Sequence, residues 1–132
     1  MQTFFKSVFA VIGAIVLILL GGWSPLLQVL VVFIAFDYIL GVLVAASYGQ
    51  LNSKIGFKGI AKKVIILALV AVAYSIDTIT GDGTFIRDAV IFFYMANELL
   101  SILETVGKTN LPIPDVLRKA VETLNGKSKS KE

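Results

Sequence analysis

Four long apolar runs constrain the fold of this chain more than any other feature of its sequence. The first run, Phe4–Gly22, is interrupted near its start by Lys6 and Ser7, and its about 19 residues approach the roughly 20 that cross a bilayer core. The second run, Leu26–Tyr48, is long enough to cross with some tilt. Hydrophobic residues make up 57% of the chain and charged residues 16%, a balance that a soluble domain of this size could not bury. The sequence therefore predicts an all-α integral membrane protein.

The segment between the first two runs predicts a tight helical hairpin. Gly21, Gly22 and Pro25 break the helix, and Trp23 is the amphipathic ring that is expected at headgroup level. A secretory signal peptide would also place a positive residue before an apolar run, but it would end in a cleavage site of small residues. The sequence Gly-Gly-Trp-Ser-Pro lacks that pattern, and a second apolar run follows at once. We expect the first run to be a retained span.

The second half of the chain predicts two further spans. Gly49–Lys63 breaks the hydropathy as a basic loop, Val64–Thr80 is the third apolar run, and Gly81-Asp82-Gly83 forms a turn. The fourth run, Ala89–Val106, is less apolar, so the alternative is three transmembrane helices plus a fourth helix that lies in the interface. We favour four transmembrane helices because the placement of charge fits four better.

The placement of Lys and Arg predicts which side each loop occupies. With four spans, both termini and the basic loop share one side, which then holds 11 of the 12 Lys and Arg residues. Only Arg87, beside Asp88, falls on the opposite side. Loops enriched in Lys and Arg face the cytoplasm, so we expect a multi-pass protein with both termini inside. The basic loop contributes Lys54, Lys58, Lys62 and Lys63, and the tail contributes Lys127, Lys129 and Lys131.

A bundle over residues 1–110 is expected to be followed by a separate cytoplasmic segment over residues 111–132. Two prolines end the membrane part, and Asp115 can cap a short amphipathic helix that runs to Leu124. Lys127–Glu132 alternates Lys and Ser, which predicts a disordered basic tail. Such a tail is either attracted to anionic lipid or simply solvated, fixing only topology and solubility.

The absence of two residue types excludes most catalytic and metal chemistry. The chain has no Cys and no His, so disulfides, thiolate metal sites and triads built on histidine are excluded. The net charge of +3 comes from basic residues beside apolar spans rather than from a patch with interleaved aromatic residues, so nucleic acid is not the expected partner. We expect a protein that is not an enzyme and has no cofactor, with membrane lipid as its surroundings.

The second run carries an acidic residue near its middle. An ionised Asp at the centre of a span costs roughly 2.5–3.5 kcal/mol, so Asp37 needs a partner or a proton, and we expect its neutral, hydrogen-bonding form. Asp37, Gly41 and Ala45 recur every four residues and share one helix face. Small residues at this spacing are typical of helix association in lipid, so this face is a candidate contact between copies.

The fourth run carries a polar stripe that is expected to turn away from lipid. Two interpretations remain open, because these side chains could hydrogen-bond within the chain or could line an oligomer contact or a water-filled lesion. Asp77 in the third run is a further candidate for such a contact or lesion, or it simply reaches the interface. The stripe consists of Tyr94, Glu98, Ser101 and Thr105, with Asn97 and Glu104 on its flanks.

Several motifs occur in a fixed order along most of the chain. The matching residues are Asp37-Tyr-Ile-Leu-Gly41, Leu51-Asn-Ser53, Gly56, Gly59-Ile60, Lys62-Lys63, Asp77, Phe93-Tyr94, Glu98-Leu-Leu-Ser-Ile-Leu-Glu104 and Leu-Pro-Ile-Pro114. In their order and spacing the chain resembles the toxin-secretion/phage-lysis holin family, which includes the clostridial toxin-secretion holins. It departs from that pattern at Thr105, where the family leads us to expect Asn, and at Thr109-Asn110, which replaces a Gly. After Met1 the next methionine is Met95, so a second, inhibitory product from an adjacent start is not supported.

The resemblance implies a protein that forms homo-oligomers in the cytoplasmic membrane of a bacterial host. Such a protein would open lesions that release an endolysin, and so lyse the host, or release a toxin, without necessarily touching either cargo. Two rival classes remain: a small oligomeric channel or transporter subunit, for which acidic residues inside the membrane are also expected, and a membrane scaffold whose basic tail recruits a partner.

Overall fold

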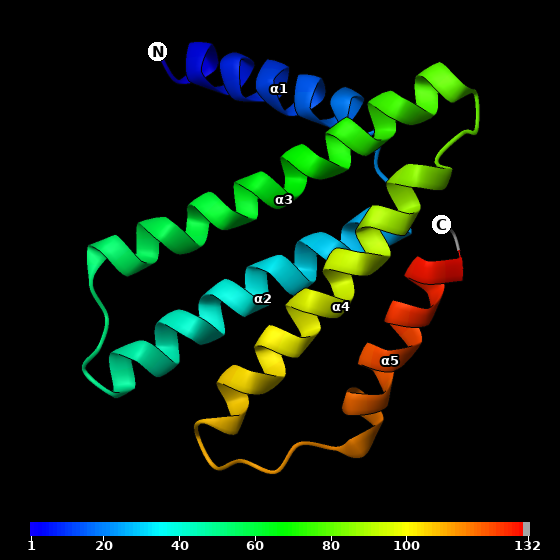
Figure 1. The fold of residues 1–132 in the computed structure, drawn as a ribbon. Coiled ribbons are helices and arrows are strands. Elements are labelled where there is room, and N and C mark those ends of the chain that lie inside the picture. The colour runs from blue at the N-terminus through cyan, green and yellow to red at the C-terminus, as the bar shows by residue number, and fades with distance from the viewer. Residues whose placement is uncertain (131–132) are drawn as a thin grey trace.

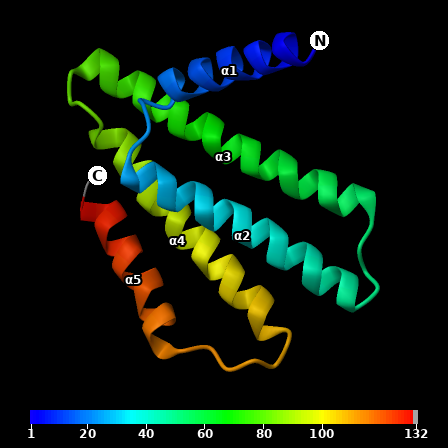
Figure 2. The same ribbon diagram turned by 180° about the vertical axis from the view of Figure 1, so that it is seen from behind.

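The structure, a computed structural model, describes residues 1–130 as five helices, with no strand in that range. Figures 1 and 2 show α4 in the middle of the molecule, packed between α2 and α3 on one side and α5 on the other, while α1 diverges from the bundle. Within the described residues α1 contacts only α3. The helices are α1 (Gln2–Leu19), α2 (Pro25–Ser47), α3 (Ser53–Thr80), α4 (Phe85–Gly107) and α5 (Asp115–Ser130).

Local sequence signals explain where these helices begin and end. The Ser24 hydroxyl accepts a hydrogen bond from the backbone N–H of Leu27, and Pro25 occupies the first turn of α2, where it needs no hydrogen-bond donor. Asn52 caps α3 in the same way, through a 2.9 Å bond from the N–H of Ile55. Gly81 ends α3 in the left-handed conformation.

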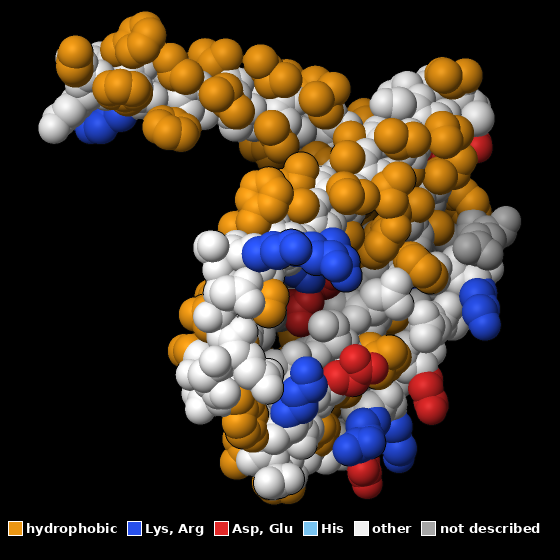
Figure 3. Space-filling view, turned by 60° about the vertical axis from the view of Figure 1, so that its left-hand side comes forward, with side chains coloured by type: hydrophobic (Ala, Val, Ile, Leu, Met, Phe, Trp, Pro, Cys, Tyr) orange, Lys and Arg blue, Asp and Glu red, His pale blue; other side chains and the backbone are white. Residues whose placement is uncertain are grey.

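Four of the five helices, α1 to α4, are long and apolar enough to cross a membrane, so the predicted all-α architecture with four such helices is confirmed. No residue of α1 is buried, and the space-filling view in Figure 3 shows hydrophobic side chains over its surface. A surface of this kind suits lipid, because acyl chains are as apolar as the side chains that they cover.

The prediction of a basic loop over Gly49–Lys63 is wrong for most of that segment. Only Tyr48–Asn52 connects α2 to α3, because α3 begins at Ser53 and carries the four lysines on a helix. The lysines broke the hydropathy of this segment without breaking the helix, since a lysine stem can lie along an apolar surface while its ammonium group reaches water. Lys54, Lys58 and Lys62 recur every four residues along α3 and are exposed, whereas Lys63 is half-buried.

The C-terminal helix is longer than predicted and lies against the bundle. The amphipathic helix was expected to stop near Leu124, but α5 continues to Ser130 and returns along α4. The Ser128 hydroxyl donates a 3.2 Å hydrogen bond to the backbone oxygen of Ala89. The predicted disorder is therefore wrong for residues 127–130, which include Lys127 and Lys129, while Lys131 and Glu132 lie outside the described residues.

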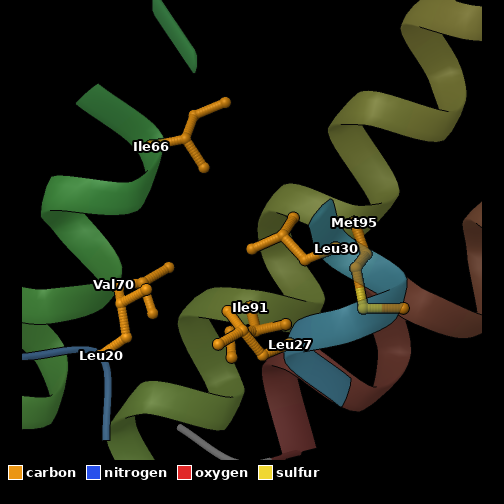
Figure 4. Packing of buried hydrophobic residues seen from close by; sticks show 7 residues of the cluster. All are labelled: Leu20, Leu27, Leu30, Ile66, Val70, Ile91 and Met95. Atoms are coloured by element: carbon orange, nitrogen blue, oxygen red, sulfur yellow. The ribbon is translucent and has the colours of Figure 1, made fainter. Parts of the chain in front are cut away.

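The apolar core joins α2, α3 and α4 in one half of their length. Leu27, Leu30, Val70 and Ile91 are completely buried, and Figure 4 shows their side chains converging between the helices. Leu20 closes this cluster from the turn between α1 and α2. This apolar layer has a layer of polar contacts on each side of it along the bundle.

Candidate functional site

One polar layer is a cluster of three charged side chains, which we call the charge triad: Asp37 on α2, Lys63 on α3 and Glu98 on α4. The Lys63 ammonium group forms an ion pair with the Asp37 carboxylate. It also donates to both carboxylate oxygens of Glu98, at 2.7 Å to Oε2 and 3.0 Å to Oε1. Asp37 and Glu98 are buried. One lysine thus links two acidic residues from different helices.

The triad members lie at equal depth. Asp37 stands ten residues before the end of α2, Lys63 ten residues after the start of α3, and Glu98 nine residues before the end of α4. These three helix ends meet at one end of the bundle, where the Tyr48 hydroxyl donates a 2.7 Å bond to the backbone oxygen of Lys108. At a rise of about 1.5 Å per residue, the triad lies about 15 Å inside that end, near the middle of a bilayer core.

Asp37 was predicted to need a partner or a proton, and the structure shows a partner. Its carboxyl group is paired with Lys63, a lysine that the hydropathy had assigned to a loop. Removing one partner from a buried ion pair costs about 3–5 kcal/mol, because an uncompensated charge is left behind. Sequence reasoning missed Lys63 as a member of the site. No signal in the sequence identified it, because its spacing from the start of α3 becomes apparent only once that helix is known to begin at Ser53.

A crevice of about 210 Å³ runs from the triad toward the Lys108 end of the bundle. Gly41 and Ala45 of α2 line it opposite Gly56 and Gly59 of α3, and a Cβ added at Gly41 would meet no atom within 4 Å. The face that we expected to contact another copy thus lies inside a single chain, next to open space. In Figure 3, acidic side chains are visible in a recess below a group of basic ones.

Tyr38 fixes the spacing between α2 and α3 along this crevice. Its hydroxyl donates a 3.4 Å bond to the backbone oxygen of Gly56, and its ring lies 3.3 Å from where a Cβ of Gly59 would stand. The two glycines therefore allow α3 to approach the tyrosine ring closely. Tyr38, Gly56 and Gly59 belong to three of the motifs on which the family resemblance rests, and they meet at this point.

The polar stripe of α4 divides into an inner and an outer part. Tyr94, Ser101 and Thr105 are half-buried and, like Glu98, line the crevices beside the triad. The flanking residues Asn97 and Glu104 are exposed. Most of the stripe thus turns toward the other helices of its own chain, and only its flanks turn outward.

The second polar layer lies at the other end of the bundle and is built on Arg87, whose role sequence reasoning also missed. Arg87 is 3% exposed. Its Nη1 donates to the backbone oxygens of Leu20, Gly21 and Gly22 at 3.1, 3.1 and 3.3 Å. Its Nη2 donates to the Ser24 hydroxyl at 3.2 Å. This guanidinium ties the turn between α1 and α2 to the start of α4.

Asp77 belongs to the same end and has a structural contact. Its two carboxylate oxygens accept 2.8 Å hydrogen bonds from the backbone N–H groups of Ile86 and Arg87. These N–H groups lie in the first turn of α4, where a negative charge stabilises the helix. Asp77 is 1% exposed, so its carboxylate is held inside the chain.

The arrangement as a whole is a closed bundle. The crevice ends at the triad, and beyond it the apolar layer fills the space between α2, α3 and α4. Among residues 1–130, no group of three acidic side chains is placed to hold a metal ion, and Lys63 occupies the two carboxylates of the triad. The geometry supports helix association in a membrane.

The fold and the site define a multi-pass helical membrane protein whose buried charged groups are paired inside the bundle. A sequence model of the bacteriophage holin family matches residues 14–126. The chain belongs to this family. No solved structure matches it.

Related proteins are found in bacteria and in a phage. An uncharacterized protein of Listeria innocua is 49% identical over 120 residues, covering 91% of this chain and 86% of the relative. One of Listeria monocytogenes is 51% identical over 116 residues, covering 88% of this chain and 83% of the relative. A protein of Bacillus phage phi105 that is named "probable holin" is 30% identical over 112 residues, covering 85% of this chain and 83% of the relative.

Proposed function

We propose that this protein is a holin: it accumulates in the cytoplasmic membrane of a bacterial host, assembles with copies of itself and opens lesions. The lesions let an endolysin reach the cell wall, which lyses the host, or let a toxin leave. Neither cargo needs to touch the protein. Membership of the holin family and the phage relative support this proposal.

The observation that carries the proposal is the pairing of charges inside a single chain. Within the triad, the carboxylates of Asp37 and Glu98 both pair with Lys63, and the apolar layer fills the bundle beside the triad. A chain built in this way can accumulate in a membrane without leaking. Opening requires neighbouring copies to supply new contacts, after which the polar side chains exchange their partners for water.

Two substitutions test whether the crevice takes part in opening. Gly41→Leu would fill the crevice and hold α2 against α3 and α4, so we expect delayed lysis with normal insertion. Glu98→Gln keeps the shape of the side chain but leaves Lys63 with one carboxylate, so we expect an altered lysis time. Lysis times equal to wild type in both variants would mean that these residues have no part in opening.

The proposed topology places both termini and the Lys108 end of the bundle in the cytoplasm, with the turn at Arg87 outside. Lys54, Lys58 and Lys62 of α3 then lie near the anionic inner leaflet. Because Ser128 of α5 contacts Ala89 near the Arg87 end, a C-terminus in the cytoplasm requires α5 to leave α4. The asymmetry of Lys and Arg in the sequence supports this orientation, since, apart from Lys63 in the triad and Arg87, the other ten belong to segments that four spans place on the inner side.

The test of the function is expression of the chain in bacteria with an endolysin that has no export signal. Culture density and membrane potential are followed together. We expect a delay, then abrupt depolarisation and lysis that depends on the endolysin. Steady growth with an intact potential, despite confirmed membrane insertion, would contradict the holin assignment.

The same experiment separates the rival classes. A channel or transporter subunit would give a discrete, ion-selective conductance and no passage of a folded endolysin. A scaffold that recruits a partner would depend on its basic tail, so removal of residues 127–132 would abolish its function. For a holin we expect that removal only to shift the time of lysis.

A further inference from the structure

One amide group stands on the outer surface in the middle of α4. Asn97 is exposed, ten residues before the end of α4, and so lies at about the depth of the charge triad. Within the described residues its side chain has no hydrogen-bond partner in the chain. Phe93 and Leu100, on the same face of the helix, are 45% and 44% exposed. The amide thus faces outward from the bundle, while Leu100 also borders a crevice beside Arg118 and Glu122 of α5.

Other polar side chains of the candidate spans have partners or lie nearer to an end. The Ser75 hydroxyl donates to the backbone oxygen of Ala71, and that of Thr78 donates to the backbone oxygen of Ser75. Gln28 lies in the first turn of α2. A lysine can extend its ammonium group to the headgroups, but the asparagine side chain is too short to do so. Asn97 is left with polar atoms that acyl chains cannot satisfy.

A second copy of the chain can satisfy them. A primary amide has two donors and one acceptor, so two asparagines can hydrogen-bond to each other. Copies inserted by the same route have the same orientation, which places their Asn97 residues at equal depth across a twofold axis. Phe93 and Leu100 would pack around that pair. Polar residues on one face of a membrane helix are typical of contacts between helices.

We propose that the face of α4 formed by Phe93, Asn97 and Leu100 is a contact between two copies of this chain, with their Asn97 amides hydrogen-bonded to each other. This inference rests on the proposed function, which requires self-association, and names the surface that serves it. It replaces the Gly41 face, which lies inside one chain, as the expected contact between copies.

The lack of cysteine allows a direct test in membranes. Leu100→Cys places a thiol on the proposed face. Ile39→Cys is the matched control, because Ile39 is 49% exposed on α2 and lies eight residues before the end of its helix, against seven for Leu100. On oxidation we expect Leu100→Cys to give disulfide-linked dimers and Ile39→Cys to remain monomeric. Equal dimer yields at the two positions, or none at either because lipid covers this face, would overturn the proposal.

Asn97 itself is tested by association in vesicles, measured as energy transfer between labelled copies. Asn97→Leu should raise the dissociation constant roughly tenfold, and Asn97→Gln, which keeps the amide, should restore association. Unchanged association of Asn97→Leu would overturn the proposal. The readout does not involve lysis, so failure of lysis by the unaltered chain would contradict the holin function alone.

Discussion

The ammonium group of Lys63 holds two carboxylates that belong to different helices. Asp37 and Glu98 would otherwise be acidic residues of like charge in the middle of a membrane. The position of one side chain thus couples the packing of α2, α3 and α4.

Replacement of Lys63 by methionine should destabilise the bundle, because both carboxylates lose their partner, and we expect a loss of about 3–5 kcal/mol. The amount of full-length protein in the membrane fraction and its melting temperature in detergent measure the effect. Lys58→Met is the control, since Lys58 is exposed on the same helix. Equal losses in the two variants would show that the triad does not hold the bundle.

Two neighbouring glycines at the Arg87 end of the bundle allow a matched comparison of the effect of an added side chain. Gly21 and Gly22 have φ values of +88° and +87°, so alanine is strained at both. A Cβ at Gly21 would stand 2.7 Å from the Tyr74 ring and 2.9 Å from Arg87 Nη1, while at Gly22 it would meet nothing within 4 Å. We expect Gly21→Ala to lower the melting temperature further than Gly22→Ala. Equal shifts would mean that the close approach of Arg87 contributes nothing.

Only some residues of the candidate site were predictable from the sequence. Asp37 and Glu98 stood out, because a carboxylate within an apolar run is costly. Lys63 did not stand out, because a lysine beside three other lysines has the pattern of a loop, and the pairing depends on three helices that are distant in the sequence. Arg87 was hidden for the same reason, since it is bound to a turn more than sixty positions away.

The C-terminal helix α5 is attached to the bundle chiefly through its apolar face. Leu124 packs against the core cluster, and Ala120 and Val121 are half-buried beside it. The opposite face of α5 carries charged residues. The amphipathic pattern predicted this face, but it could not predict that the face would lie on α4.

Leu124→Ser should release α5 from α4, because the substitution removes an apolar side chain from the contact, at a cost of about 2–3 kcal/mol. The rate of trypsin cleavage after Arg118 and Lys119, in protein held in detergent, reports the release, and we expect it to rise several-fold. Leu117→Ser is the control, since Leu117 is 41% exposed. Similar rates for the two variants would indicate that α5 is not held through Leu124.

The number and order of the long helices were predictable from hydropathy, because the apolar length that spans a bilayer is set by the bilayer itself. The start of α3 was not. Its first turns carry lysines, and hydropathy treats them as the end of a span although the backbone remains helical from Ser53.

For the whole molecule, the two polar layers fix which turns share an end. Arg87 joins the turn before α2 to the start of α4, and Tyr48 reaches Lys108 at the opposite end. Charge asymmetry then predicts which end faces the cytoplasm. The fold shows which turns lie at the same end of the bundle, and labelling in cells shows which end faces the cytoplasm.

Single cysteines test that orientation. Trp23→Cys and Asp82→Cys lie in exposed turns at the Arg87 end, and Ser53→Cys lies at the Lys108 end. We expect a membrane-impermeant maleimide to label the first two in intact cells and to label Ser53→Cys only after permeabilisation. The reverse pattern would place the Lys108 end outside.

The triad also has a consequence for the order of biosynthesis. A chain made from its N-terminus delivers Asp37 to the membrane 26 residues before Lys63, and Lys63 35 residues before Glu98. A nascent chain that has inserted α1 and α2 holds a lone acid, and the arrival of α3 brings the base. The second acid then enters beside a base that is already in place. We therefore expect pauses in translation after α3 to be better tolerated than pauses after α2.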